Sequence, residues 1–293
     1  RALAPAPPAT LDALVSLASQ LTRDSAGKQA NQAGFSAASA VQWGFYVRGE
    51  AYWFLPFLWA EGGGLFNPIS LEIKINHPAA QRALGRYSGL MRELHAAPPN
   101  TSPSDDYQQM SQLFGRGKVA MIVNGPWAIS ALLREQAFSD PRQLGIAPFP
   151  RGASGEALAP FSGHGYMVSK CAKDPAAAWK LAAALAGMEA QVRFARESHL
   201  LPALRAAYHQ PGVRDDPIVS AFAVALKSTR GRPRHPAVAR IFDDFTPAVQ
   251  AVLQGDAQPA EALDGVARAW RRLLGPALSA PDAGVAAPRE VSP

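Results

Sequence analysis

The candidate strands of this chain are short and far apart in the sequence, which limits the possible folds more than any other feature. They are Leu71–Ile75, Val119–Val123, Leu144–Ala147 and Tyr166–Ser169. The first alternates, with Leu71, Ile73 and Ile75 on one face. Helical patterns separate the strands, and the chain contains no internal repeat. This arrangement predicts an α/β fold with an interrupted sheet and argues against a barrel of eight even units.

Helical periodicity covers most of the remaining chain. Thr10 is a plausible N-cap for a helix that begins at Leu11, and a second helix starts at Pro78. We expect a short helix over 107–114 and another from Trp127 to about Gln136. Beyond these, helices are predicted over Pro175–Ala186, Glu189–Glu197, Pro217–Leu226, Val238–Leu253 and Ala260–Leu274. The last residues, Pro276–Pro293, lack periodicity and are predicted to form a disordered tail.

Composition excludes several classes of protein. The chain has 293 residues, of which 48% are hydrophobic and 18% charged, so it can bury a core. No apolar run reaches the ~18 residues that a membrane-spanning helix requires. Its single cysteine, Cys171, excludes an internal disulfide framework and is expected to be a small buried residue. Because the chain starts at Arg1 without an initiator Met or a signal peptide, we expect a processed product or a fragment.

Motifs of enzyme chemistry are weak. The segment 115–118 (Gly-Arg-Gly-Lys) lacks the spacing and the following Ser or Thr of a phosphate-binding loop. We predict no catalytic residue, no cofactor and no metal site. The pairs Asp105-Asp106 and Asp243-Asp244 are interpreted as solvated surface charges. Glu50 lies among aromatic residues and needs water or a polar partner. A glycoside-acting enzyme that uses Glu50 as one of two carboxylates remains an alternative.

The charge pattern leaves a second alternative open. The formal net charge is +6, and basic residues cluster only at 230–234 and 268–272. A nucleic-acid-binding domain would use such clusters and would lose affinity steeply with added salt. A solvated loop explains 230–234 better, so we expect no nucleic-acid partner.

The most aromatic segment, Val41–Gly64, ends at three consecutive glycines. Tyr52, Trp53 and Trp127 each lie beside a break in regular structure. Sugars present flat C–H faces that stack on aromatic rings, and their hydroxyls bond carboxylates and amides. These rings therefore indicate either a saccharide site or part of an ordinary core.

The order of several short motifs favours the first interpretation. They are Thr10–Leu14, Glu50–Trp53 running into Ala60–Gly63, Phe114 with Gly117–Ile122, Asn124–Ala128, Gly145–Pro150 and Phe161–Gly165. This succession resembles the sugar-type extracellular solute-binding proteins of ABC importers, the maltose/maltodextrin-binding family. The resemblance spans about Pro7 to Leu274, and its most specific part runs from Gly117 to Trp127.

By this resemblance the chain has a periplasmic-binding-protein-like (type II) α/β fold, in which two hinged lobes close over a sugar without transforming it. The residues that match the family's cleft follow in chain order. Glu50, Tyr52 and Trp53 match a glutamate and aromatics that meet the sugar. Trp127 matches a stacking tryptophan, and Phe242 falls roughly where a third ring stacks, although the maltose binder has Trp there. His164 either donates to a hydroxyl or only occupies a turn.

Family members begin with a long segment of strands and helices that builds most of the first lobe and that this chain lacks. The resemblance therefore predicts an N-terminally incomplete protein. The expected parts are 1–166 and 210–275 from the helix-rich C-terminal lobe, 167–209 as a remnant of the N-terminal lobe, and the tail 276–293.

The function implied is that of an extracytoplasmic component of an ABC sugar importer, in the periplasm or attached to the cell surface. Its expected partners are a maltose- or maltodextrin-type oligosaccharide and the permease subunits in the membrane. Because most of the first lobe is expected to be absent, we expect millimolar or weaker binding and impaired closure of the two lobes. The surface exposed by the missing lobe is expected to drive self-association.

Overall fold

A computed structural model of the chain describes residues 6–99, 106–156 and 158–275. The helices are α1 (Leu11–Leu21), α2 (Ala51–Ala60), α3 (Pro78–Arg92), α4 (Asp106–Gly115), α5 (Ile129–Leu132), α6 (Pro175–Ala186), α7 (Met188–Ser198), α8 (Pro217–Ala225), α9 (Ile241–Gln254) and α10 (Pro259–Leu274). The strands are β1 (Arg23–Asp24), β2 (Ala40–Gln42), β3 (Ala159–Phe161) and β4 (Thr229–Gly231). Helices thus dominate the described chain, as the periodicity predicts.

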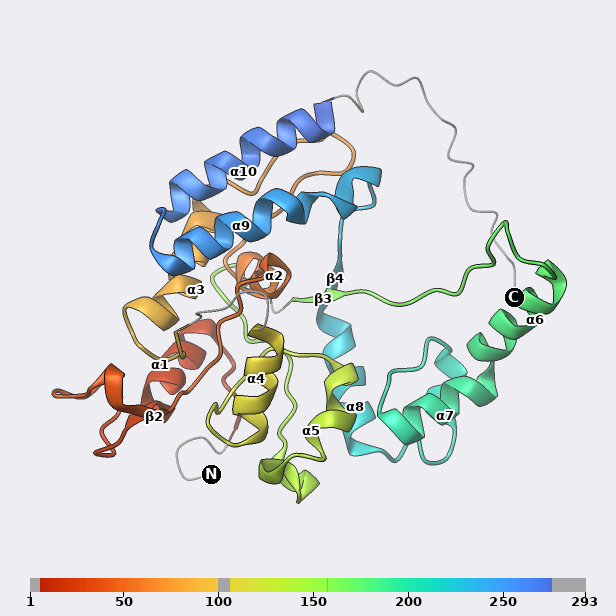
Figure 1. The fold of residues 1–293 in the computed structure, drawn as a ribbon, viewed down its shortest axis with the longest axis horizontal. Coiled ribbons are helices and arrows are strands. Elements are labelled where there is room, and N and C mark those ends of the chain that lie inside the picture. Colours follow the sequence, from red (N-terminus) through yellow and green to blue (C-terminus); the bar gives the residue numbers. More distant parts are fainter. Residues whose placement is uncertain (1–5, 100–105, 157, 276–293) are drawn as a thin grey trace.

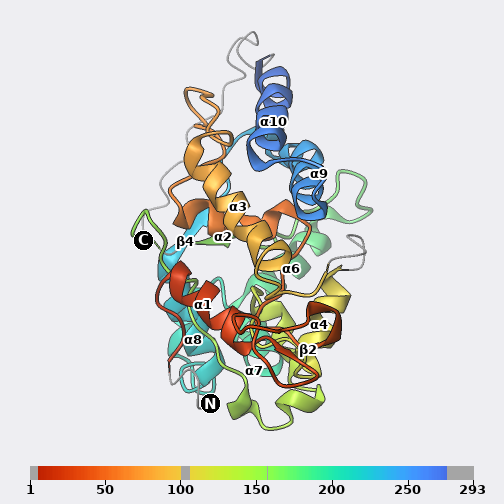
Figure 2. The ribbon, with the colours of Figure 1, turned by 90° about the vertical axis from the view of Figure 1, so that its left-hand side faces the viewer.

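Helix α2 forms the centre of the core. Nine of its ten residues are buried, which is typical of a helix that is apolar on all sides. Helices α3 and α9 pack against it, and α10 packs on both of them, side by side with α9 along one edge of the molecule (Figures 1 and 2). Phe245 of α9 connects α2 with α10, because its ring centroid lies 5.9 Å from that of Phe54 and 5.8 Å from that of Trp270.

The sheet structure is interrupted, as expected. Strands β1 and β2 pair antiparallel, and β3 and β4 form a separate parallel pair. Between these pairs, extended chain leads into α2 and is held by single backbone bonds. The Trp43 N–H donates to the Lys118 carbonyl (2.9 Å), and the Phe45 N–H donates to the Ala96 carbonyl (3.0 Å). These bonds fix the chain before α2 against the loops that follow α3 and α4.

None of the four predicted strands is a strand in the structure. Leu71–Ile75 and Val119–Val123 each contribute only an isolated bridge, at Ile73 and at Val119, and Leu144–Ala147 and Tyr166–Ser169 form no ladder with any described segment. A strand needs a paired neighbour, and Met167 within the last of these segments is 92% exposed. The helix predicted from Trp127 to Gln136 is also shorter, because α5 ends at Leu132 and has only a small apolar cluster to pack on.

Residues 162–228, which we call the outer unit, leave the central helices between β3 and β4. A long extended segment leads from β3 to α6, and the chain returns through α7, a 3-10 turn over Arg205–His209 and α8 (Figure 1). The outer unit has its own small cluster of Ala195, Val213 and Val219. The part boundaries at 166/167 and 209/210 stay predictions, and the tail 276–293 lies outside the described residues.

The prediction that Cys171 is buried is wrong, because the thiol is exposed in the extended part of the outer unit. Nothing in that segment packs over it. None of the helices in the described ranges is long and apolar enough to cross a membrane.

Candidate functional site

Five aromatic side chains meet at the N-terminal end of α2, and we call them the ring cluster: Tyr52, Trp53, Tyr107, Trp127 and Phe242. Trp53 lies at its centre. Its ring centroid is 5.5 Å from that of Tyr52, 6.2 Å from that of Tyr107 and 6.3 Å from that of Trp127. Phe242, from α9, extends the row beyond Tyr52 at 6.5 Å. Side chains from four separate parts of the sequence thus form one continuous cluster.

The members of the ring cluster differ in exposure. Trp127 is 53% exposed, whereas Trp53 is 8% exposed. Tyr52, Tyr107 and Phe242 are half-buried. Trp127 therefore offers the largest open face, and Trp53 mainly supports its neighbours from beneath.

The Asn124-Gly125-Pro126-Trp127 turn explains how the Trp127 indole reaches the cluster. The indole folds back over Gly125, where a Cβ atom would come within 2.1 Å of a ring carbon. Only glycine leaves that space, so this position in the motif has a steric reason. Asn124 contributes a buried side-chain nitrogen that has no hydrogen-bond partner in the described part of the chain.

Glu50 lies at the edge of the ring cluster, directly before α2. Its Oε2 accepts a hydrogen bond from the Trp53 indole nitrogen at 3.2 Å and lies 3.5 Å from a guanidinium nitrogen of Arg48. The side chain is 52% exposed, and its Oε1 has no hydrogen-bond partner among the described residues. One carboxylate oxygen is thus committed to the protein, and the other faces outwards.

The Tyr52 hydroxyl completes the polar groups of the cluster. Burial raises the pKa of Tyr52, the nearby charge of Glu50 raises it further, and Arg232 acts in the opposite direction. The phenol is therefore protonated at neutral pH, and it can both donate and accept a hydrogen bond. Flat rings beside a phenol and a carboxylate suit a ligand with apolar C–H faces and hydroxyl groups.

The sequence-predicted residues are brought together with one exception. Glu50, Tyr52, Trp53, Trp127 and Phe242 lie in or beside the ring cluster. His164 is exposed in the outer unit and has no hydrogen bond or ring contact with the cluster in the described structure. Its role stays a prediction.

Sequence reasoning missed Tyr107, Arg48 and Asp106. Asp106 was interpreted as a solvated surface charge, which is wrong, because it is 1% exposed and bonds Arg48. Asp243 and Asp244 are exposed, as predicted. The signal available in the sequence was a charged residue beside an aromatic run. It could not show that Arg48 pairs with Asp106, because the two residues are 58 positions apart.

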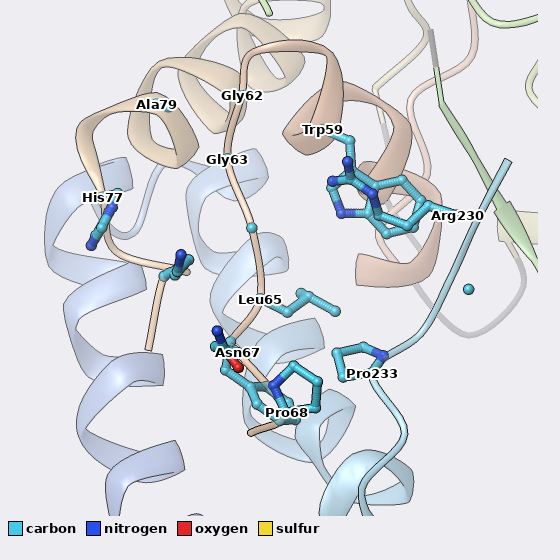
Figure 3. A pocket seen from close by; sticks show the side chains of 14 residues that line it. Trp59, Gly62, Gly63, Leu65, Asn67, Pro68, His77, Ala79, Arg230 and Pro233 are labelled. Atoms are coloured by element: carbon cyan, nitrogen blue, oxygen red, sulfur yellow. The ribbon is translucent and has the colours of Figure 1, made fainter. Parts of the chain in front are cut away.

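A separate cavity of about 450 Å³ lies at the other end of α2 (Figure 3). Its wall includes the Gly62–Gly64 turn, His77 and Arg230. The Arg230 guanidinium lies 5.5 Å from the centroid of the Trp59 ring and bonds Glu156 at 3.0 Å. A helix of ten residues separates this cavity from the ring cluster by about 15 Å. Because Arg230 covers Trp59 and is itself paired, the cavity offers no open ring face.

The glycine turn has a packing reason at Gly63. A Cβ atom there would lie 2.4 Å from a Leu58 methyl carbon and 3.0 Å from the Leu58 carbonyl oxygen. The chain can therefore turn closely around the end of α2 only without a side chain at this position.

Comparison with known proteins gives the family. Residues 2–192 match the model of the bacterial extracellular solute-binding proteins. The galactooligosaccharide-binding protein of Bacillus subtilis is 28% identical over 206 residues, which are 70% of this chain and 47% of that protein. The maltodextrin-binding protein MdxE of the same organism is 30% identical over 144 residues, which are 49% of this chain and 33% of that protein.

Solved structures agree on the fold. The GacH receptor of Streptomyces glaucescens, crystallised unliganded and with acarbose, is 29% identical and superposes with a TM-score of 0.80. The match covers 92% of this chain and 65% of that one. The MalE domain of Bdellovibrio bacteriovorus bound to maltotriose is 23% identical, with a TM-score of 0.75 over 94% of this chain and 68% of that one.

The chain spans about half the length or less of these two curated relatives and about two thirds of the solved structures. The fold is therefore periplasmic-binding-protein-like, helix-rich α/β, and corresponds to part of such a protein. Proteins of this kind bind solutes and are not enzymes. The family match covers well over half of the chain, so the chain belongs to the bacterial extracellular solute-binding protein family.

Proposed function

We propose that this chain binds an oligosaccharide of the maltose or maltodextrin type as the solute-binding component of an ABC sugar importer. The observation that carries the proposal is the ring cluster, in which rings from α2, α4, α9 and the Asn124–Trp127 turn meet beside Glu50. Similarity to proteins named for galactooligosaccharide and maltodextrin binding supports the same class of ligand.

The proposed binding mode assigns a role to each group. Trp127 stacks on a pyranose face, and the edges of Tyr52 and Phe242 extend the apolar contact. Glu50 accepts from sugar hydroxyls through Oε1, and the Tyr52 phenol exchanges hydrogen bonds with them. Trp53 supports Trp127 from beneath. His164 is retained only as a candidate donor from the outer unit.

We further propose that binding by this chain is weak. Each stacking ring contributes about 0.5–1.5 kcal/mol beyond the burial of its area. Association costs at least about 4 kcal/mol of translational and rotational freedom. With contacts from one side only, we expect a dissociation constant in the millimolar range or above. The proposed partners are the permease subunits, and the proposed location is the periplasm or the outer cell surface.

A titration with maltose and maltotriose, followed by calorimetry and by NMR, tests this function. We expect saturable binding that Trp127→Ala reduces at least tenfold. Trp179→Ala is the matched control, because its indole is also exposed, at 63%, but lies in the outer unit. Absence of saturable binding to any malto-oligosaccharide contradicts the proposed ligand. Micromolar affinity contradicts the weak-binding proposal alone.

A further inference from the structure

Arg48 is a buried arginine directly below the ring cluster. Its side chain is 8% exposed, although arginine is seldom buried without a partner. The Cζ atom lies 4.5 Å from the centroid of the Trp53 ring and 5.0 Å from that of Tyr107. The guanidinium therefore contacts two of the five rings.

Asp106 holds the guanidinium in place. Its Oδ1 accepts from Arg48 Nε at 3.0 Å and from a terminal nitrogen at 2.6 Å. Its Oδ2 accepts from the Gly49 N–H at 2.7 Å, so the same carboxylate also fixes the backbone that carries Glu50. The Tyr87 hydroxyl adds two bonds at 2.9 Å, one from the Arg48 N–H and one to the Arg48 carbonyl.

The ion pair is connected to the proposed sugar contacts by a short chain of interactions. Arg48 attracts Glu50 Oε2 at 3.5 Å, and the same oxygen accepts from the Trp53 indole nitrogen. Arg48 thus acts on Glu50 by charge and on Trp53 by a cation–π contact. The guanidinium makes both contacts while two of its nitrogens bond Asp106, and a lysine ammonium keeps the charge but lacks this planar fork of donors.

We infer that Arg48, held by Asp106, is the positioning residue of the ring cluster: it fixes the orientation of Trp53, which supports Trp127, and of Glu50, which meets the ligand. It does not contact the ligand itself. The ligand in question is the oligosaccharide of the proposed function, so the inference rests on that function for its effect on affinity. The effect on Trp53 and Glu50 exists without any ligand.

The Trp53 indole N–H signal in ¹H–¹⁵N NMR tests the inference without sugar. Arg48→Lys is expected to shift and broaden this signal, because the ammonium keeps the charge but loses the two-point bond to Asp106 that fixes its position beside Trp53 and Glu50. Arg86→Lys is the matched control. Arg86 bonds Asp12 and Glu61 (3.1 Å to the latter) near the other end of α2, so the signal is expected to stay in place. An unchanged Trp53 signal in folded Arg48→Lys overturns the inference.

A second variant covers the case in which Arg48→Lys does not fold. Asp106→Asn keeps the shape of the side chain and removes its charge. It is expected to move the same indole signal in the same sense, by a smaller amount. A folded Asp106→Asn protein with the wild-type signal overturns the inference as well.

Sugar affinity gives the functional test. Arg48→Lys is expected to weaken maltotriose binding about fivefold, and Arg86→Lys is expected to leave it unchanged. In a double-mutant cycle, Arg48→Lys is expected to cost little more once Glu50→Gln is present, because Arg48 acts through Glu50. If the losses of affinity caused by Arg48→Lys and Glu50→Gln are fully additive, the positioning role of Arg48 is contradicted. If the wild-type chain binds no sugar but Arg48→Lys still moves the Trp53 signal, the proposed function fails and the positioning role stands.

Discussion

Helices α2 and α6 have similarly apolar sequences but opposite surroundings. In α2 nine of ten residues are buried, whereas in α6 no residue is buried among twelve. Trp179 and Leu181 of α6 are 63% and 61% exposed, but Trp59 of α2 is 2% exposed. Apolar composition therefore does not decide burial by itself. It decides burial only where other elements cover the helix.

The same contrast holds for the two regions around these helices. In the central region α3 and α9 pack on α2 and α10 packs on α3 and α9, and the core of this region contains most of the large buried rings. The outer unit has one small cluster around Ala195 and many exposed apolar side chains. Regions with few buried apolar contacts open at low free-energy cost, so the two regions are expected to differ in local stability.

The largest expected effect tests this contrast directly. Trp270→Ala removes a fully buried indole that packs on Phe66 and Phe245 and donates to the Ile241 carbonyl at 3.1 Å. We expect it to lower the free energy of unfolding by about 3–5 kcal/mol. Trp179→Ala is expected to change it by less than about 0.5 kcal/mol. Urea unfolding measures both. Equal losses would show that α6 is covered in solution.

The fold was predictable where local signals agree with packing. Thr10 caps α1 as expected, with its hydroxyl accepting from the Ala13 N–H at 3.1 Å, and the bounds of α6 match the predicted helix over Pro175–Ala186. The strand predictions were wrong for a physical reason. Tyr166–Ser169 has a strand-like pattern, but no described segment lies beside it to complete a ladder.

In the candidate site, four of the five rings were predictable from the sequence, whereas Tyr107 and the charges below the rings were not. Glu50, Tyr52, Trp53 and Trp127 stand in recognisable motifs, so a resemblance was enough to choose them. The contact between Arg48 and Asp106 joins α4 to the chain before α2. No local pattern predicts such a long-range pair.

A second prediction concerns the exposed apolar side chains of α6. We expect the chain to self-associate through this helix, because Trp179 and Leu181 are large and exposed, and exposed apolar surface favours association. Replacing both Trp179 and Leu181 by Ser is expected to weaken self-association several-fold in sedimentation velocity. Ile69→Ser is the control, since Ile69 is 91% exposed in the central region. A wild-type chain that is monomeric at all concentrations contradicts this prediction.

The smallest expected effect comes from replacing two aspartates whose pKa values are lowered, Asp24 in the central region and Asp215 in the outer unit. In Asp24, burial opposes the shift, but hydrogen bonds from the N–H groups of Ser36, Lys28 and Ala26 outweigh it. In Asp215, the main cause is the side-chain hydrogen bond from Arg214 at 2.9 Å. Both carboxylates favour the folded state above the ordinary pKa of 3.8, and this contribution is lost as the pH falls through the lowered value.

The two aspartates are expected to differ in the size of that contribution. Asp24 accepts from three backbone N–H groups, two in the turn that follows it and one from Ser36, whereas Asn is neutral and has only one side-chain oxygen to accept them. Arg214 and Asp215 form an exposed pair that water and salt screen. Asp24→Asn is therefore expected to lower the urea midpoint at pH 7 and to flatten its decline below about pH 4. Asp215→Asn is expected to leave both unchanged. A larger effect at Asp215 would mean that the outer unit is held more firmly than its exposed surface indicates.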